Sequence, residues 1–176
     1  AGLGVVCLTN QKARGVTGSS APIGDPFDID YVAHEIGHQF GCNHTFNNSC
    51  GGNRNNATAV EPGSGSTIMA YAGICAPNIQ NNSDDYFHGI SLEEMGNHLA
   101  STSCPVVTAL ANAAPNITGT NGNITVPANT PFALTAFAID PDGDILSYCW
   151  EQMDNDISAQ APVGTSTGGP NFRSNS

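Results

Sequence analysis

Basic residues are scarce in this chain of 176 residues. Four lysines and arginines stand against fifteen aspartates and glutamates, so the formal net charge is −11 at pH 7. A surface of that sign repels the phosphate backbone of nucleic acids and the headgroups of anionic lipids. We therefore expect no nucleic-acid partner and no role at a charged membrane surface.

Long hydrophobic runs are also lacking. No apolar segment approaches the roughly 20 residues that a membrane-spanning helix requires, so we expect no membrane span. The N-terminal stretch AGLGVVCL is apolar but has no basic leader before it, and it reads neither as a signal peptide nor as an anchor. We expect any targeting segment to have been removed or left out.

Cysteine pairs of the CxxC kind are missing too. This argues against a zinc ribbon or a thioredoxin-type site and predicts dispersed disulfides in an oxidising compartment. The protein is therefore expected to be secreted. Spacing alone leaves the connectivity open, because six cysteines can pair in many ways: Cys7, Cys42, Cys50, Cys75, Cys104 and Cys149.

A helix is strongly predicted from residue 25 onward. Asp25 is a good N-cap, Pro26 suits the first helical position, and Gly41 is placed to end the helix through a left-handed turn. Before this helix, residues 3–8 (LGVVCL) read as a short buried or edge strand. Apolar residues spaced by three and four give the helix one apolar face: Ile29, Val32, Ala33, Ile36 and Phe40.

Residues 45–66 are so rich in Asn, Gly and Ser that they predict a long irregular loop. A loop of this length inside a compact domain is usually functional or stapled. A second helix is expected from Ser91 in SLEEMGNHLAST, where Ser91 and Glu94 would form a capping box. Its inward-facing residues would be Leu92, Met95 and Leu99.

The composition of the sequence changes at about residue 106. Residues 106–115 are linker-like, and strand patterns follow in NITV, PFALTAFAI and ILSYCW, separated by Asn, Gly and Pro. They read as the opening strands of a partial β-sandwich over residues 116–176. The acidic stretch DPDGD is interpreted as a hairpin turn, with a Ca²⁺ site as the alternative: Asp140, Asp142 and Asp144.

Three of the five histidines fall in HEIGHQFGCNH, which spans His34 to His44. Residues four apart share one face of a helix, so His34 and His38 can present imidazoles to one ion while Glu35 lies beside them. Gly41 breaks the helix and lets His44 supply a third ligand, which leaves a fourth tetrahedral position open for water. We predict a Zn²⁺ site here and interpret the remaining two histidines as structural or surface residues.

The pattern HExxHxxGxxH is that of the metzincin zinc endopeptidases, which also carry a methionine-containing turn below the metal. This chain has such a turn at STIMAYAGIC, which contains Met69. Residues 1–105 resemble the reprolysin or adamalysin clan, and in particular the reprolysin-like peptidases of secreted bacterial proteins. Thr45 departs from the aspartate of typical reprolysins and resembles the pappalysin branch, so the subfamily stays open.

The resemblance implies an α+β fold class. Residues 1–105 would be the C-terminal half of an α/β/α metzincin catalytic domain whose N-terminal part is missing, followed by the linker and the start of an all-β Ig-like sandwich. An upstream segment of the same precursor is then expected to pair with residues 3–8. A protein or peptide substrate is expected to bind as an extended strand along the same edge.

The resemblance also implies roles for single residues. Met69 would pack under the three imidazoles without binding the metal. Tyr71 has the M-x-Y spacing at which some metzincins place a tyrosine that touches zinc or the oxyanion, and the alternative is a wall aromatic. Cys7 would pair with Cys104, and stapling of the long loop would pair Cys50 with Cys75, which leaves two cysteines over.

These inferences predict a secreted zinc metalloendopeptidase. A zinc-activated water would attack the peptide bond with Glu35 as general base. The alternatives are a catalytically silent metzincin relative and an adhesion or substrate-binding module. Glu35 favours the enzyme, because a purely structural zinc site has no use for a carboxylate beside an open coordination position.

Overall fold

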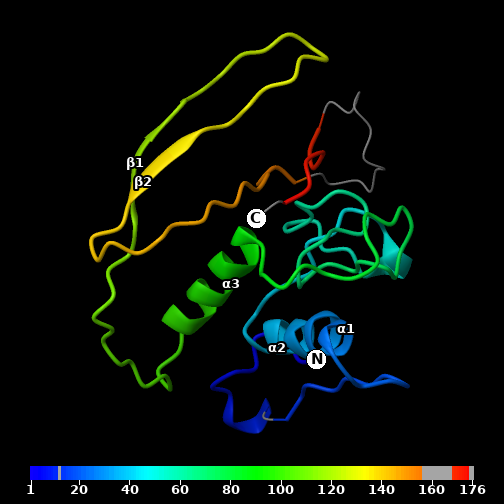
Figure 1. Ribbon diagram of the computed structural model, residues 1–176. Coiled ribbons are helices and arrows are strands. Elements are labelled where there is room, and N and C mark those ends of the chain that lie inside the picture. The colour runs from blue at the N-terminus through cyan, green and yellow to red at the C-terminus, as the bar shows by residue number, and fades with distance from the viewer. Residues whose placement is uncertain (12, 156–167, 175–176) are drawn as a thin grey trace. The chain divides into compact units, whose positions relative to one another are not determined.

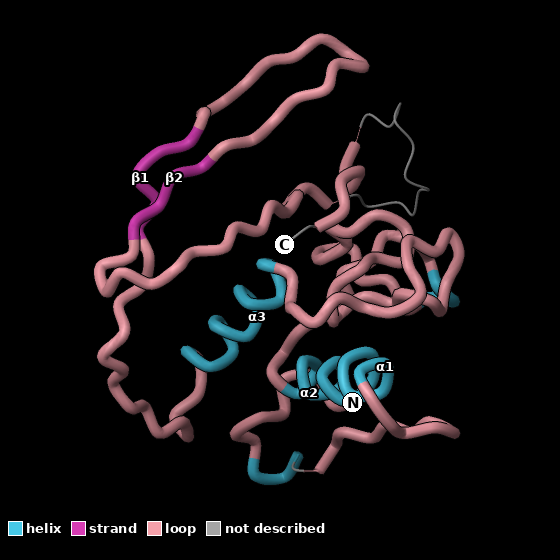
Figure 2. The backbone as a smooth tube through the Cα atoms, in the orientation of Figure 1, coloured by secondary structure: helices cyan, strands magenta, loops and turns pink. Residues whose placement is uncertain are grey.

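The computed structural model describes residues 1–11, 13–155 and 168–174. They divide into two compact units, which are residues 1–105 together with the described part of 150–174, and residues 106–149. Irregular segments make up most of both units (Figure 2). All of HEIGHQFGCNH lies in the first unit.

The predicted first helix is present as one helical run, which we call the motif helix. It consists of α1 (Asp25–Phe27), a π-helical segment η2 (Asp28–Ala33) and α2 (His34–Gln39), as Figure 1 shows. The residue at the N-cap is Gly24, so the prediction of Asp25 as the cap was wrong by one position. The carboxylate of Asp25 instead lies in the first turn, where the helix dipole favours it.

The apolar face of the motif helix is only partly turned inward. Ile29 and Ala33 pack against the core, whereas Ile36 is 46% exposed. The π-helical segment explains the difference, because its wider turn shifts later residues away from the period of 3.6 on which the prediction was based.

The motif helix ends as predicted, in a left-handed turn at Gly41, whose φ is +99°. The amide of Gly41 donates to the carbonyl of His38, and the amide of Cys42 donates to that of Gly37. This pair of hydrogen bonds is the Schellman arrangement. It turns the chain back toward the helix and so brings His44 near its two partners.

The prediction of a strand over residues 3–8 was wrong. Gly4 and Cys7 have positive φ values of 59° and 71°, which are incompatible with an extended strand. The amides of Gly4 and Val6 donate to the carbonyls of His38 and Gln39 at 2.9 and 3.1 Å. The segment therefore satisfies carbonyls at the end of the motif helix, and a 3-10 turn η1 (Thr9–Gln11) follows it.

The long loop after His44 is irregular, as predicted, but it is also buried. Every residue from 58 to 70 is buried. Its only regular features among the described residues are a 3-10 turn η3 (Cys50–Gly52) and a single parallel bridge between Phe46 and Glu61. The hydrophobic core lies where this loop meets the two longest helices: Cys42, Ile68 and Met69, with Ile29, Ala33, Phe87 and Met95 packed on them.

The second helix, α3 (Gly89–Ala100), starts two residues earlier than predicted. Its N-cap is His88, whose Nδ1 accepts a hydrogen bond from the amide of Ile90 at 3.2 Å. The predicted capping box is absent, because Glu94 binds the backbone and side-chain amides of Asn43 instead. Met95 faces the core as predicted, whereas Leu92 and Leu99 are exposed.

Two disulfides stabilise the first unit. They join Cys7 to Cys104 and Cys50 to Cys75, which are the pairs that the resemblance and the loop stapling imply. The first ties the N-terminal segment to the residues after α3. The second closes a loop of 25 residues between the segment after His44 and the methionine turn.

The second unit contains a two-stranded antiparallel sheet of β1 (Asn116–Thr120) and β2 (Ala136–Ile139). The strands predicted at 123–126 and 145–150 are not formed as strands. Ile145 is fully exposed, so the apolar segment that it begins has no packed surface against which to form a strand. Asp140 accepts hydrogen bonds from the amides of Asp142 and Asp144, which makes DPDGD a turn. Among the described residues these carboxylates form no metal-binding group, so calcium is not supported.

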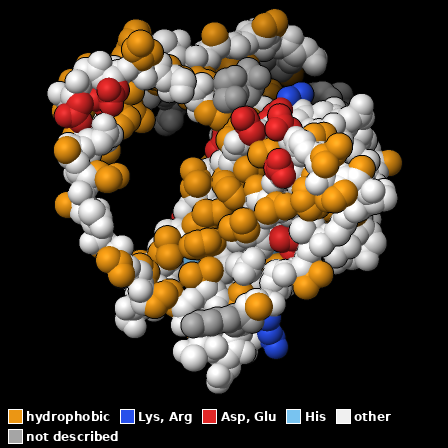
Figure 3. All heavy atoms as spheres, turned by 60° about the horizontal axis from the view of Figure 1, so that its bottom comes forward, with side chains coloured by type: hydrophobic (Ala, Val, Ile, Leu, Met, Phe, Trp, Pro, Cys, Tyr) orange, Lys and Arg blue, Asp and Glu red, His pale blue; other side chains and the backbone are white. Residues whose placement is uncertain are grey.

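No helix in the described ranges is long and apolar enough to cross a bilayer. The face of the molecule in Figure 3 carries more acidic than basic side chains, in keeping with the net charge. The only group of His, Cys, Asp and Glu side chains within the described residues whose geometry suits a metal ion is the histidine triad of the motif.

Candidate metal centre

The three motif histidines come from two elements. His34 and His38 lie one turn apart on α2, and His44 follows the Gly41 turn. One ring nitrogen from each lies within 4.8 Å of the other two. The ring centroids are 4.7 Å apart for His34 and His38, 4.7 Å for His38 and His44, and 5.3 Å for His34 and His44. The rings therefore converge on one point.

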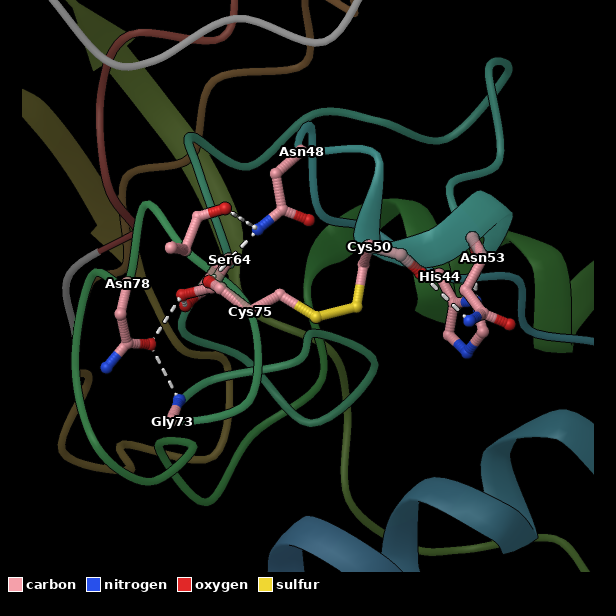
Figure 4. Close-up of a disulfide and its surroundings, with 10 residues drawn as sticks. His44, Asn48, Cys50, Asn53, Ser64, Gly73, Cys75 and Asn78 are labelled. Atoms are coloured by element: carbon pink, nitrogen blue, oxygen red, sulfur yellow. Dashed lines mark hydrogen bonds between the residues drawn. A yellow bond between two sulfur atoms is a disulfide. The ribbon is translucent and has the colours of Figure 1, made fainter.

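Each imidazole is oriented by a backbone carbonyl. The Nδ1 atoms of His34, His38 and His44 each lie 2.7 Å from a carbonyl oxygen, and Figure 4 shows the contact between His44 and Asn53. A carbonyl only accepts, so each Nδ1 carries the proton and each Nε2 keeps its lone pair. Metal-binding histidines are held in this way. The three carbonyls belong to Ile68, Cys42 and Asn53.

The spacing of the lone pairs fits a tetrahedral cation. His38 Nε2 and His44 Nε2 are 3.1 Å apart, and neither has a proton to donate to the other. Two facing lone pairs repel each other unless a positive charge lies between them. Zinc with bonds of about 2.0 to 2.1 Å to imidazole places its ligand nitrogens about 3.3 Å apart. The donor set is therefore suited to zinc.

Burial keeps the three rings neutral. It lowers the pKa of His34 to about 4, and repulsion from His38 adds to the effect, while the Ile68 carbonyl opposes it. Burial likewise lowers the pKa of His44 to about 4. The pKa of His38 is lowered for the same reason. At neutral pH all three side chains are thus in the form that binds a metal.

An open cavity of about 380 Å³ lies beside His38 and His44. Its polar lining includes the carboxylate of Glu35, whose Oε2 lies 2.7 Å from the amino nitrogen of Ala1. The side chain of Glu35 is 24% exposed, although its Oε2 atom is buried. Three amide side chains, one arginine and two apolar residues also line it: Asn43, Asn53, Asn55, Arg54, Ala1 and Leu3.

Tyr71 lines the same cavity. Its ring centroid lies 4.6 Å from that of His44 and 5.6 Å from that of His34. Burial raises the pKa of the Tyr71 phenol, and the carboxylate of Glu35 adds to the rise. The hydroxyl therefore stays protonated at neutral pH and can donate a hydrogen bond.

Met69 lies against the motif helix. It is fully buried, and a Cβ placed on Gly37 would lie only 2.4 Å from Met69 Sδ. Glycine at residue 37 thus lets the methionine turn approach the helix at the level of the histidines. The carbonyl of Ile68, next to Met69, is the one that orients His34.

The family model for Metallo-peptidase family M12B, Reprolysin-like, matches residues 1–98. That segment is more than half of the chain. The chain belongs to this family. No curated protein and no solved structure gives a significant match.

Membership of the M12B family accounts for the motif, since its metallopeptidases use zinc. Several parts of this M12B site were nevertheless not predicted from the sequence. Backbone carbonyls such as those of Asn53 and Ile68 leave no mark in a sequence. Glu61 does stand out in the sequence, because it is the only acidic residue between Glu35 and Asp84.

Proposed function

We propose that this M12B metallopeptidase is a secreted zinc endopeptidase with Glu35 as its general base. The observation that carries the proposal is the convergence of three Nε2 lone pairs, each fixed by a carbonyl on Nδ1, at the edge of a cavity lined by Glu35 and Tyr71. A structural zinc site would use a fourth protein ligand and would be closed.

Zinc held by His34, His38 and His44 would supply a Lewis acid for the scissile carbonyl and would make a nearby water more acidic. Glu35 takes one proton from the attacking water as the new C–O bond forms. It then passes that proton to the amine nitrogen as the C–N bond breaks. Water is thereby divided between the two products, and no covalent enzyme intermediate forms.

Tyr71 has the protonation state needed for a second role. As negative charge develops on the carbonyl oxygen, a phenol hydroxyl that stays protonated can donate a hydrogen bond to it. We assign this role to Tyr71 because it lines the cavity and packs on His44.

The substrate is a protein or peptide in an extended conformation. Asn43, Asn53 and Asn55 offer amide donors and acceptors along the cavity, and these suit the backbone of an extended peptide. Because residues 3–8 are not a strand, we propose that the three asparagine side chains contribute to the binding of the substrate backbone. The upstream segment of the precursor stays a prediction, but residues 3–8 do not offer it a strand edge, because the amides of Gly4 and Val6 already donate to carbonyls of the motif helix.

Secretion is supported by the two disulfides, which persist in oxidising compartments and are rare in the cytosol.

The test compares wild type with Glu35→Gln for bound zinc and for cleavage of a peptide library. We expect both proteins to hold one zinc per chain and the variant to lose at least about a hundredfold in turnover. Glu93→Gln, an exposed change on α3, is the matched control and should behave as wild type. A wild-type protein that holds zinc but cleaves nothing would support the silent relative instead, and equal loss of zinc and activity would make Glu35 structural.

A further inference from the structure

Glu61 is a buried carboxylate that has no part in the mechanism above. It is 1% exposed, and it lies in the irregular loop between His44 and the methionine turn. Five hydrogen bonds converge on its two oxygens. Oε1 accepts from the amides of Ser66 and Thr67 at 2.8 and 3.0 Å and from Ser66 Oγ at 3.3 Å, and Oε2 accepts from Thr45 Oγ1 and Thr67 Oγ1 at 2.5 and 2.6 Å.

Two of these donors stand next to parts of the metal centre. Thr45 directly follows the ligand His44, and Thr67 directly precedes Ile68, whose carbonyl orients His34. One carboxylate oxygen, Oε2, binds both hydroxyls. The side chain of Glu61 therefore links the segment that carries the third ligand to the segment that orients the first.

Backbone contacts reinforce this link. The amide of Glu61 donates to the carbonyl of Thr45 at 2.9 Å, and the amide of Thr45 donates to the carbonyl of Met69 at 3.2 Å. The turn around the carboxylate is tight, because a Cβ on Gly65 would lie 2.6 Å from the Cβ of Ala70 and 3.2 Å from that of Glu61. No continuous sheet ladder sets the spacing of these segments, and the carboxylate adds two hydroxyl contacts to the direct backbone hydrogen bond between Thr45 and Met69.

We propose that Glu61 is a positioning residue that fixes the distance between His44 and the carbonyl that holds His34, and so sets the geometry of the metal centre. The proposal rests on the zinc site of the proposed function. It also explains Thr45, the residue at which the sequence departs from typical reprolysins. The hydroxyl of Thr45 is the donor through which the carboxylate reaches the ligand segment.

The first test is Glu61→Gln, with Glu93→Gln as the matched control on the exposed face of α3. The amide keeps the size of the side chain but turns one acceptor into a donor, which then faces hydroxyl and amide donors. We expect zinc affinity, measured by competition with a chelator, to fall about ten- to a hundredfold, as for other groups that orient metal ligands. The visible spectrum of the Co²⁺-substituted protein should also change, because it reports ligand geometry. The control should match wild type in both.

A second pair of variants covers the case in which Glu61→Gln does not fold. Thr45→Val replaces the hydroxyl by a methyl group of similar size, and Thr45→Ser keeps the hydroxyl. We expect Thr45→Val to weaken zinc binding and alter the Co²⁺ spectrum. Thr45→Ser should have the zinc affinity and the Co²⁺ spectrum of wild type.

The outcomes separate the two proposals. If the variants lose stability but keep wild-type zinc affinity and the wild-type Co²⁺ spectrum, Glu61 is merely structural and the inference is overturned. A wild-type chain that binds no metal would overturn the metal centre itself. If wild type binds zinc, and Thr45→Val and Glu61→Gln have the same zinc affinity and Co²⁺ spectrum as wild type, only the role of Glu61 is overturned.

Discussion

His44 Nδ1 lies 2.7 Å from the carbonyl oxygen of Asn53, nine residues further along the loop. The side-chain amide of Asn53 in turn donates to the carbonyl of Cys50, which is joined to Cys75 by a disulfide (Figure 4). A ring of the metal centre is thus held by a carbonyl whose own position depends on a covalent link. The long loop is part of the site and not an insertion beside it.

This chain of contacts predicts the effect of removing the disulfide. Cys50→Ser with Cys75→Ser should lower the free energy of unfolding by about 3 kcal/mol, the value expected for a loop of this length. It should also weaken zinc binding, because Asn53 loses its anchor. The measurements are urea unfolding and chelator competition. The control is Cys7→Ser with Cys104→Ser, which should lower stability while affecting zinc affinity less, and equal effects on zinc from the two pairs would contradict the prediction.

Tyr71→Phe should separate the two roles considered for this tyrosine. If the phenol donates to the developing oxyanion, its loss should lower kcat by about a hundredfold and leave KM nearly unchanged. The change keeps the ring that packs on His44 and Phe46. Steady-state kinetics on one peptide substrate decides the question. An altered KM with normal kcat would make Tyr71 a wall of the substrate site.

The buried histidines predict how acid acts on the metal-free protein. Burial lowers the pKa of His34 to about 4, whereas the unfolded chain has the ordinary value near 6.5. The unfolded state therefore takes up protons first as the pH falls. The contribution of neutral His34 to the free energy of unfolding should be fully present above about pH 6.5. It should be lost as the pH falls toward 4, which lowers the free energy of unfolding by about 3 kcal/mol for His34 alone. Urea unfolding in the presence of EDTA measures this slope, and His34→Gln should flatten it. An equal slope in wild type and variant would refute the assignment.

Two glycines on different helices give a matched pair of stability tests. A Cβ on Gly37 would lie 2.4 Å from Met69 Sδ, so Gly37→Ala should destabilise the protein by about 1 to 3 kcal/mol. A Cβ on Gly96 in α3 meets nothing within 4 Å, so Gly96→Ala should stabilise it by about 0.5 to 1 kcal/mol. Thermal unfolding compares the two. A Gly37→Ala protein as stable as wild type would show that the methionine turn does not press on the motif helix.

The sequence predicted those parts of the site that depend on local signals. The motif helix and its end at Gly41 follow from the proline in its first turn, apolar spacing and the conformational freedom of glycine. The histidine spacing predicted convergence because a helix places residues four apart on one face.

Tertiary contacts decided the remaining elements, and the sequence does not encode these locally. Residues 3–8 have a strand-like composition, but their amides bind the end of the motif helix. Ser91 has a good capping signature, yet His88 caps α3, and Glu94 is bound to Asn43. The carbonyls that orient the histidines belong to residues whose side chains carry no information about that role.

The most direct test is a crystal structure of the zinc-loaded protein with anomalous data at the zinc edge. We predict one zinc per chain, bonded to Nε2 of His34, His38 and His44 at about 2.0 to 2.1 Å. Each Nδ1 should keep its hydrogen bond to a backbone carbonyl, and the fourth position should open to the cavity beside Glu35. A histidine that points away from the metal, or a fourth protein ligand that closes the site, would contradict this account.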